Sequence, residues 1–202
     1  MFPTTKHSTV VFRNQVSQTA LQKKAAKGEG FSDNFTGMRI VTLGRLSKEK
    51  GQHMIPEVVS RLKNEGFTFR WYLIGDGNLR TVIEKSIANL KIEDQIILLG
   101  SKLNPYPYLK VCDLYVQTSL HEGYCITLHE AKVFGKPVVT TNFLSASNLI
   151  GNEVDGLIVD ISKEGLYTGV KKLLEDDNLR KKLSGGILAQ KNTAPNIVDL
   201  FK

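Results

Sequence analysis

The chain has 202 residues, which corresponds to one domain or at most two small ones. Hydrophobic residues make up 41% and charged residues 23%, a balance that excludes a disordered chain, a collagen-like fibre and a coiled coil. The apolar runs are as long as strands, whereas a spanning helix needs about 20 apolar residues. We expect no secretory signal, because the N-terminus lacks an apolar segment. Two cysteines do not make a disulfide framework, so we expect a cytoplasmic protein.

The formal net charge is +7, from 27 Lys and Arg against 20 Asp and Glu. A basic surplus favours anionic partners such as phosphorylated metabolites, anionic lipid or nucleic acid. The basic clusters are short and lie in segments of helical period, which is typical of solvated helix faces. Because no aromatic residues are interleaved with them, we expect no nucleic-acid partner.

Short apolar runs alternate with longer segments of helical period, the pattern of βαβ units. The predicted strands are residues 9–12, 39–43, 69–74, 95–99, 113–117, 137–140 and 156–159. The predicted helices are residues 54–64, 79–89, 106–110, 127–134, 163–174 and 178–190. Most strands show no polar alternation, as expected for strands buried on both faces. The sequence therefore predicts an α/β fold with a Rossmann-like, doubly wound and mostly parallel sheet. The polar segment 15–37 is expected to hold a helix and a loose connector.

Ligands of open α/β sheets bind beyond the carboxyl ends of the strands. Arg45 and Lys50 follow the strand 39–43 in a loop bounded by glycines, where both can turn toward one pyrophosphate. An ordinary solvated loop is the alternative interpretation. After the strand 69–74, Gly75-Asp76-Gly77 lacks the third glycine of a dinucleotide fingerprint and is expected to form a tight turn. Since no P-loop motif occurs either, nicotinamide and P-loop enzymes are disfavoured.

Two glutamates eight positions apart follow the strand 113–117. Glu122 precedes a glycine turn, and Glu130 lies one turn inside the next predicted helix. The free N–H groups that open this helix would bind a phosphate. A carboxylate can accept both hydroxyls of a vicinal diol, so one glutamate for a sugar and one for a ribose fits a nucleotide sugar. On spacing alone, a helix-dipole role for Glu122 and a solvent-facing Glu130 are equally compatible.

Glu122-Gly123-Tyr124, followed by Glu130-Ala131 and Gly135-Lys136-Pro137-Val138-Val139, resembles the Glu-x7-Glu region of the retaining group 1 (family 4) glycosyltransferases, which have the GT-B fold. Further motifs occur in the family's order and spacing: Gly44-Arg45-Leu46, Lys50-Gly51, Ile74-Gly75-Asp76-Gly77, Leu99-Gly100, Cys112-Asp113-Leu114 and Asp155-Gly156-Leu157-Ile158-Val159. The resemblance covers residues 38–183. Each motif alone is weak, whereas the ordered set is specific.

The resemblance implies a role for each matching residue. Arg45 and Lys50 would hold the donor diphosphate, Glu130 would bind the ribose, and Glu122 would contact the transferred sugar as the candidate catalytic residue. The loop around Lys102 would contact the base. Backbone amides would bind sugar and phosphate at Gly123, Tyr124, Cys125, Ile126 and Thr127. Because Arg and Lys take the place of a cation at the leaving diphosphate, neither a metal nor a cofactor is expected, and the nucleoside diphosphate sugar is the donor substrate.

Some positions depart from the family pattern. Cys125 stands where glycine is common, and Thr118 stands where proline is common. We expect Cys125 to be a tolerated small residue, with a reactive thiol as the alternative. Residues 142–148 replace a glycine-rich acidic segment, which puts sugar or acceptor contacts there in doubt. The histidines show no metal-ligand spacing and are expected to be structural or surface residues.

The resemblance matches the C-terminal, donor-binding half of a GT-B enzyme. It implies a leading strand, helix and connector in residues 1–36, a nucleotide-sugar-binding domain in 37–190 and a tail in 191–202. The N-terminal acceptor domain would be missing, either by truncation or because a separate chain supplies it. The whole enzyme would transfer a sugar to a hydroxyl acceptor with retention, in polysaccharide or glycoconjugate biosynthesis. It would touch a membrane only through the absent half, and this chain alone is expected to be inactive. An inactive nucleotide-sugar-binding subunit and a GT-B epimerase or phosphorylase remain alternatives.

Overall fold

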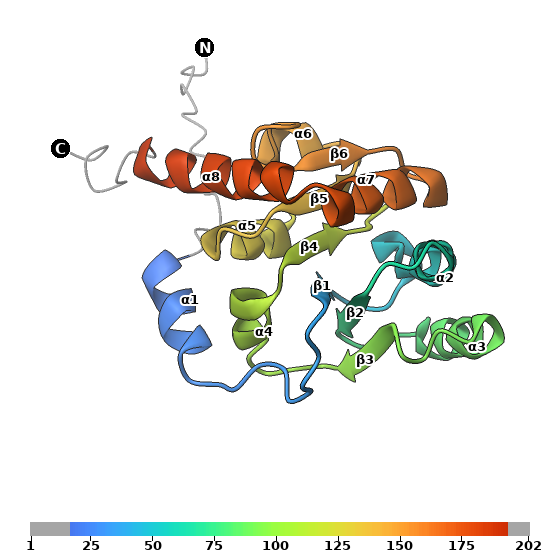
Figure 1. Cartoon of the computed structure of the whole chain (residues 1–202). Helices are drawn as coiled ribbons and strands as arrows, with labels where there is room; N and C mark the ends of the chain where they lie inside the picture. Colours follow the sequence, from blue (N-terminus) through green and yellow to red (C-terminus); the bar gives the residue numbers. More distant parts are fainter. Residues whose placement is uncertain (1–16, 194–202) are drawn as a thin grey trace, which may run out of the picture.

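The computed structural model describes residues 17–193, and its centre is a six-stranded sheet in the order β3-β2-β1-β4-β5-β6 (Figure 1). Every neighbouring pair of strands is parallel. The strands are β1 (Met38–Leu43), β2 (Phe69–Ile74), β3 (Ile96–Gly100), β4 (Leu114–Gln117), β5 (Val138–Thr141) and β6 (Leu157–Val159). These six confirm the predicted strands from residue 39 onward, and the predicted strand 9–12 lies outside the described residues. The chain winds outward from β1 to β3 and then from β4 to β6, so the switch point of this doubly wound sheet lies between β1 and β4.

Helices connect the strands as the βαβ pattern predicts. They are α1 (Gln18–Ala25), α2 (Ile55–Asn64), α3 (Arg80–Leu90), α4 (Tyr106–Val111), α5 (Ile126–Val133), α6 (Ala146–Leu149), α7 (Lys163–Glu175) and α8 (Asp177–Thr193). The short 3-10 helices η1 (Lys48–Lys50) and η2 (Gln52–Met54) precede α2. The helical pattern did not predict α6, η1 or η2, because segments of three or four residues are too short to show a period.

The sheet separates two apolar cores. Helices α2, α3 and α7 cover one face, while α4, α5 and α6 cover the other (Figure 1). Neighbouring residues of β2 show the division, since Trp71 packs in the first core and Tyr72 in the second. Successive strand side chains point to opposite faces, so strands covered on both sides have no polar alternation. This burial explains the continuous apolar runs of the sequence.

The connector after α1 is tied to the sheet rather than loose. The carboxylate of Asp33 accepts hydrogen bonds from Arg39 Nη2 at 2.8 Å, from Arg70 Nη1 at 2.9 Å and from the Tyr72 hydroxyl. The Arg70 guanidinium also lies over the ring of Phe35, 4.7 Å from its centre. Asp33 therefore fastens the connector to β1 and β2.

We expect Asp33→Asn to lower the free energy of unfolding by about 1–2 kcal/mol at pH 7. Burial opposes ionisation of Asp33, but hydrogen bonds from Arg39, Tyr72 and Arg70 outweigh it and hold its pKa at about 2, below the ordinary 3.8. A lowered pKa stabilises the fold above about pH 4, and this contribution is lost as the pH falls toward 2. Urea denaturation at several pH values measures the gap between wild type and variant, which should narrow below pH 4. A gap independent of pH would contradict the role of the charge.

Candidate functional site

The loops that follow β1, β2 and β3 meet at the carboxyl edge of the sheet. Gly44 N donates to Ile74 O at 2.9 Å, and Gly75 N donates to Gly100 O at 2.9 Å. A shallow cavity of about 290 Å³ opens where these loops meet. Its lining residues are Leu43, Gly44, Arg45, Ile74, Gly75, Asp76, Ser101 and Lys102. The structure thus brings together Arg45 and Lys102, which the sequence places 57 positions apart.

Two glycines allow this close packing of loops. At Gly75, φ is +139° and a Cβ would lie 2.0 Å from Gly44 O. At Gly51, φ is +69° and a Cβ would lie 2.1 Å from Thr118 O. Thr118 Oγ1 in turn donates to Lys50 O at 2.6 Å, a bond that a proline at this position cannot make. Gly75 therefore allows the close approach of the loop after β1, while the tight turn expected at residues 75–77 lies just after them, at residues 78–79. Gly51 docks η1 on the end of β4.

Lys50 and Glu122 form an ion pair across the switch point. The Nζ atom of Lys50 lies 2.6 Å from Oε1 of Glu122, whose side chain is 9% exposed. Ser119 Oγ at 2.6 Å and Gln117 Nε2 at 3.2 Å also donate to this oxygen. Arg45 is exposed and makes no ion pair within the described part of the chain. Lys50, predicted for the diphosphate, and Glu122, predicted for the sugar, are therefore neighbours.

The start of α5 lies beside this pair. Cys125 occupies the N-cap position without a side-chain cap; Ile126 N donates to Tyr124 O at 3.0 Å and Leu128 N donates to Cys125 O at 3.2 Å. Burial raises the pKa of the Cys125 thiol to about 11, which opposes formation of the thiolate that a reactive cysteine needs. Tyr124 and Ile126 are exposed, and Ser145 Oγ just before α6 donates to Gly123 O at 3.2 Å. The geometry suits an anion at the helix start.

Glu130 lies within α5 and pairs with α4. Its Oε1 accepts a hydrogen bond from the Tyr106 hydroxyl at 2.9 Å. Burial raises the pKa of Glu130, although the bond from Tyr106 and the charge of Lys24 act in the opposite direction. Burial and the nearby carboxylate raise the pKa of Tyr106 to about 12. Glu130 is thus half-buried and hydrogen-bonded, unlike the solvent-facing alternative.

The sequence analysis missed Tyr106, Gln117 and Ser119 as members of the site. A usable signal existed for two of them, since Gln117-Thr118-Ser119 places three polar residues in succession at the end of a buried strand. The position of Tyr106 carried no such signal, because its contact with Glu130 depends on how α4 packs beside α5.

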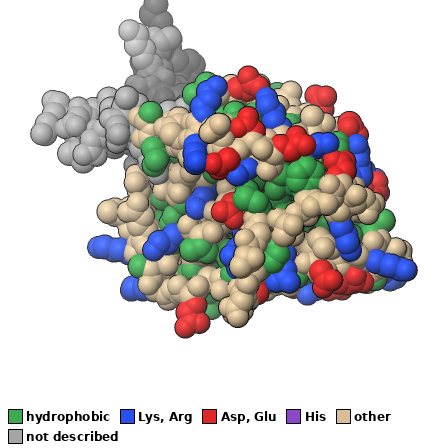
Figure 2. Space-filling view, viewed as in Figure 1, with side chains coloured by type: hydrophobic (Ala, Val, Ile, Leu, Met, Phe, Trp, Pro, Cys, Tyr) green, Lys and Arg blue, Asp and Glu red, His purple; other side chains and the backbone are tan. Residues whose placement is uncertain are grey.

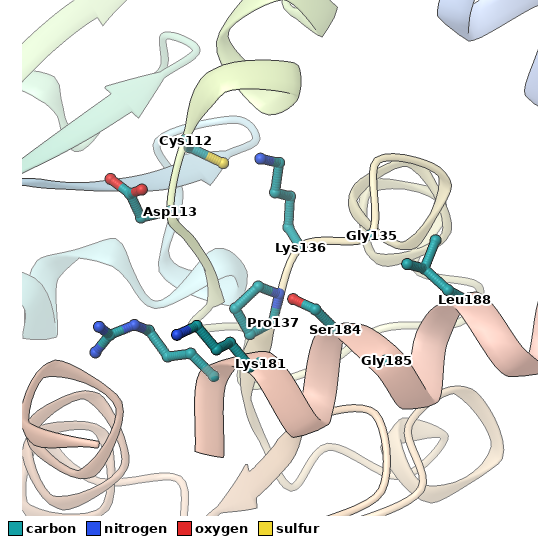
Figure 3. A pocket seen from close by; sticks show the side chains of 10 residues that line it. Cys112, Asp113, Gly135, Lys136, Pro137, Lys181, Ser184, Gly185 and Leu188 are labelled. Atoms are coloured by element: carbon teal, nitrogen blue, oxygen red, sulfur yellow. The ribbon is translucent and has the colours of Figure 1, made fainter. Parts of the chain in front are cut away.

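A second cavity, of about 370 Å³, opens at the opposite edge of the sheet (Figure 3). Cys112 and Asp113 before β4, Lys136 before β5 and residues of α8 line it. Arg180, which also lines this cavity, donates a hydrogen bond from Nη2 to Asp177 Oδ1 at 3.0 Å. Because this cavity lies at the amino ends of the strands, it is not where an open α/β sheet binds its ligand.

Residues 17–193 also carry charged and metal-ligating side chains outside this site. On the face shown in Figure 2, basic and acidic side chains are interspersed. Among residues 17–193, no three His, Cys, Asp or Glu side chains gather so that they could hold a metal ion. His121 is exposed, and the ring of His129 stacks on Tyr124 with centres 4.7 Å apart. Within the same residues, no helix has the length and apolar character needed to cross a bilayer.

The sequence pattern of the family described as "Glycosyl transferases group 1" matches residues 33–186. The chain belongs to the group 1 glycosyltransferases. A Campylobacter jejuni N-acetylgalactosamine-N,N'-diacetylbacillosaminyl-diphospho-undecaprenol 4-alpha-N-acetylgalactosaminyltransferase is 31% identical over 85% of this chain and 46% of its own length. The lipopolysaccharide core biosynthesis glycosyltransferase LpsD of Rhizobium meliloti is 31% identical over 73% of this chain and 42% of its own length. This group 1 chain thus spans a little under half the length of these curated relatives.

Solved structures share the fold of this glycosyltransferase chain. Anabaena HepE in complex with UDP has a TM-score of 0.72 at 21% identity, covering 90% of this chain and 49% of its own. The C-terminal domain of a Francisella tularensis group 1 glycosyltransferase, LpcC, has a TM-score of 0.70 at 20% identity, covering 88% and 93%. The fold is therefore Rossmann-like, that of one half of a GT-B glycosyltransferase.

Proposed function

We propose that this chain is the donor-binding half of a retaining glycosyltransferase, which moves a sugar from a nucleoside diphosphate sugar to a hydroxyl acceptor. The observation that carries the proposal is the convergence at the switch point of Lys50, Glu122 and the start of α5. Two cations, a carboxylate and the N-terminus of a helix suit a diphosphate joined to a sugar. The acceptor site would belong to a second domain, in the same protein or in a separate chain.

Each residue of the site has a proposed task. Arg45 and Lys50 bind the donor diphosphate and stabilise its negative charge as the bond to the sugar breaks, so the proposal needs no metal cofactor. The amides at the start of α5 bind phosphate and sugar oxygens, and Glu122 accepts hydrogen bonds from the transferred sugar. Glu130 accepts the ribose hydroxyls, and backbone near Lys102 contacts the base. Lys50 must turn from Glu122 toward the diphosphate when the donor arrives.

The relatives suggest where to begin the search for substrates. Solved structures of HepE contain UDP and UDP-glucose, and the named relatives act on diphospho-undecaprenol saccharides and in lipopolysaccharide core biosynthesis. We therefore propose a uridine diphosphate sugar as the donor and a saccharide of a glycoconjugate or polysaccharide as the acceptor. Such an enzyme would work in the cytoplasm and meet a membrane through its other half.

Calorimetric titration of this chain with UDP, GDP, ADP and NAD, without metal, tests the proposal. We expect one diphosphate, UDP, to bind selectively and Glu130→Ala to abolish the binding. Glu93→Ala, which removes an exposed carboxylate before β3, is the matched control and should bind like wild type. Absence of binding by all four compounds, or equal binding by Glu130→Ala, would contradict a donor site at this edge.

We expect UDP-glucose to bind more weakly as the pH falls from 8 to 5. Ribose hydroxyls need the ionised carboxylate, and burial raises the pKa of Glu130, so protonation begins at a higher pH than for an exposed glutamate. Tyr106→Phe removes a hydrogen bond that favours the ionised form, so the midpoint of this loss should move to higher pH. Tyr108→Phe in the same helix is the control. A midpoint that stays in place or falls in Tyr106→Phe would contradict this assignment.

A further inference from the structure

The carboxyl end of β4 buries an amide side chain. Gln117 is 1% exposed, and the hydroxyl-bearing residues Thr118 and Ser119 that follow it are fully buried. A buried polar group that loses its partner costs about 1–3 kcal/mol. Such a group at the end of a strand therefore needs partners that satisfy both ends of its amide.

Four hydrogen bonds satisfy the Gln117 amide. Its Oε1 accepts from the Tyr115 hydroxyl at 2.6 Å and from Thr127 Oγ1 at 3.0 Å. Its Nε2 donates to Ser119 Oγ at 2.6 Å and to Glu122 Oε1 at 3.2 Å. An ionised carboxylate only accepts hydrogen bonds. The amide nitrogen must therefore face Glu122, and the hydroxyls of Tyr115 and Thr127 must donate to the other end.

This amide helps to hold one oxygen of Glu122, and the proposed function assigns the other oxygen to the sugar. The bonds from Lys50, Ser119 and Gln117 all fall on Oε1. When Lys50 turns to a diphosphate, Ser119 and Gln117 remain to hold that oxygen. Thr127 belongs to the first turn of α5, but its contact with the amide is made by its hydroxyl, whereas the proposed phosphate contacts are made by backbone N–H groups.

We propose that Gln117 is a positioning residue, which orients Glu122 toward the transferred sugar. This inference rests on the proposed function of the site. It predicts that Gln117 matters for the sugar and not for the diphosphate, since its effect passes through Glu122. A residue that only stabilised the fold would affect both ligands alike.

Calorimetry of Gln117→Met with UDP-glucose and with UDP separates these roles. We expect the affinity for UDP-glucose to fall about tenfold, as one charged hydrogen bond lost from a carboxylate implies, while the affinity for UDP changes less than about twofold. The effect should not add to that of Glu122→Gln, because both act through one contact. Equal losses for both ligands, no loss, or full additivity would overturn the proposal.

Thr140→Val is the matched control. Thr140 pairs with Gln117 in register on the neighbouring strand and is fully buried, but its hydroxyl lies against Thr141 O at 3.3 Å and not against Glu122. Thr140→Val should leave the affinities for UDP and for UDP-glucose unchanged. If Thr140→Val lost affinity for UDP-glucose alone, the proposal would be overturned. If Gln117→Met does not fold, Gln117→Asn keeps an amide in the core but is one methylene too short to span from Tyr115 to Glu122, and the same result is expected.

¹³C NMR can report the surroundings of the Glu122 carboxylate in the absence of any donor. The signal of its carboxyl carbon is assigned by its loss in Glu122→Gln. We expect this signal to shift in Gln117→Met and to stay in place in Thr140→Val. If the signal shifts in Gln117→Met but the wild-type chain binds no UDP, the proposed function is contradicted while the contact between Gln117 and Glu122 stands. If the signal does not shift in Gln117→Met although the wild-type chain binds UDP-glucose, only the positioning role of Gln117 is overturned.

Discussion

Lys50→Ala is expected to weaken UDP binding by one to two orders of magnitude at low ionic strength. A charged hydrogen bond contributes about 1.5–3 kcal/mol, and about 1.4 kcal/mol corresponds to a factor of ten. The loss should shrink at high salt, because part of the attraction is screened. Calorimetric titration with UDP at two salt concentrations measures both effects.

Two variants sharpen the prediction for Lys50. Lys48→Ala removes an exposed lysine of the same 3-10 helix η1 and should bind UDP with less than about a threefold loss, since exposed charges contribute little. Glu122→Gln weakens the ion pair that holds Lys50, so UDP affinity should stay the same or rise. Equal losses in Lys48→Ala and Lys50→Ala would contradict a specific role for Lys50.

Asp155→Ala is expected to lower the free energy of unfolding by about 3–5 kcal/mol, as the loss of one partner of a buried ion pair does. Asp155 is fully buried; its Oδ2 lies 2.7 Å from Lys132 Nζ, and its Oδ1 accepts from Gly151 N at 2.7 Å. The variant leaves a cation and an N–H group of the loop before β6 without this carboxylate. Because Lys132 lies in α5, the helix that carries Glu130 should loosen as well.

Urea denaturation measures the loss at Asp155, and Lys172→Ala is its control. Lys172 pairs with Glu153 at 2.8 Å, but both side chains are about half exposed, so the expected cost is below about 1 kcal/mol. A loss as small for Asp155→Ala as for Lys172→Ala would show that the buried pair is not needed for the fold.

The sequence predicts the fold well because strands that are buried on both faces of the sheet appear as continuous apolar runs. The apolar runs at residues 69–74 and 113–117 end where polar loops begin, and the intervening helices repeat at helical spacing. The short helix α6 could not be predicted in this way, since its four residues make no full amphipathic period.

The site is predictable only to the level of an edge and a set of loops. Glu122 and Glu130 follow one strand, so their common edge is implied by the sequence. The pairing of Lys50 with Glu122 joins residues 72 positions apart, and that of Tyr106 with Glu130 joins residues 24 positions apart. Which atoms meet there depends on how η1 docks on β4 and how α4 packs beside α5. No local sequence pattern indicates those contacts.

Chemical-shift mapping of UDP on the ¹⁵N-labelled chain tests the central claim most directly. We expect the perturbed amides to belong to Arg45, Lys50, Lys102 and residues 123–127, at the carboxyl edge of the sheet. The amides of Lys136 and Arg180, which line the cavity at the amino edge, should stay in place. Perturbations centred on that opposite cavity, or none at saturating UDP, would contradict a donor site at the switch point between β1 and β4.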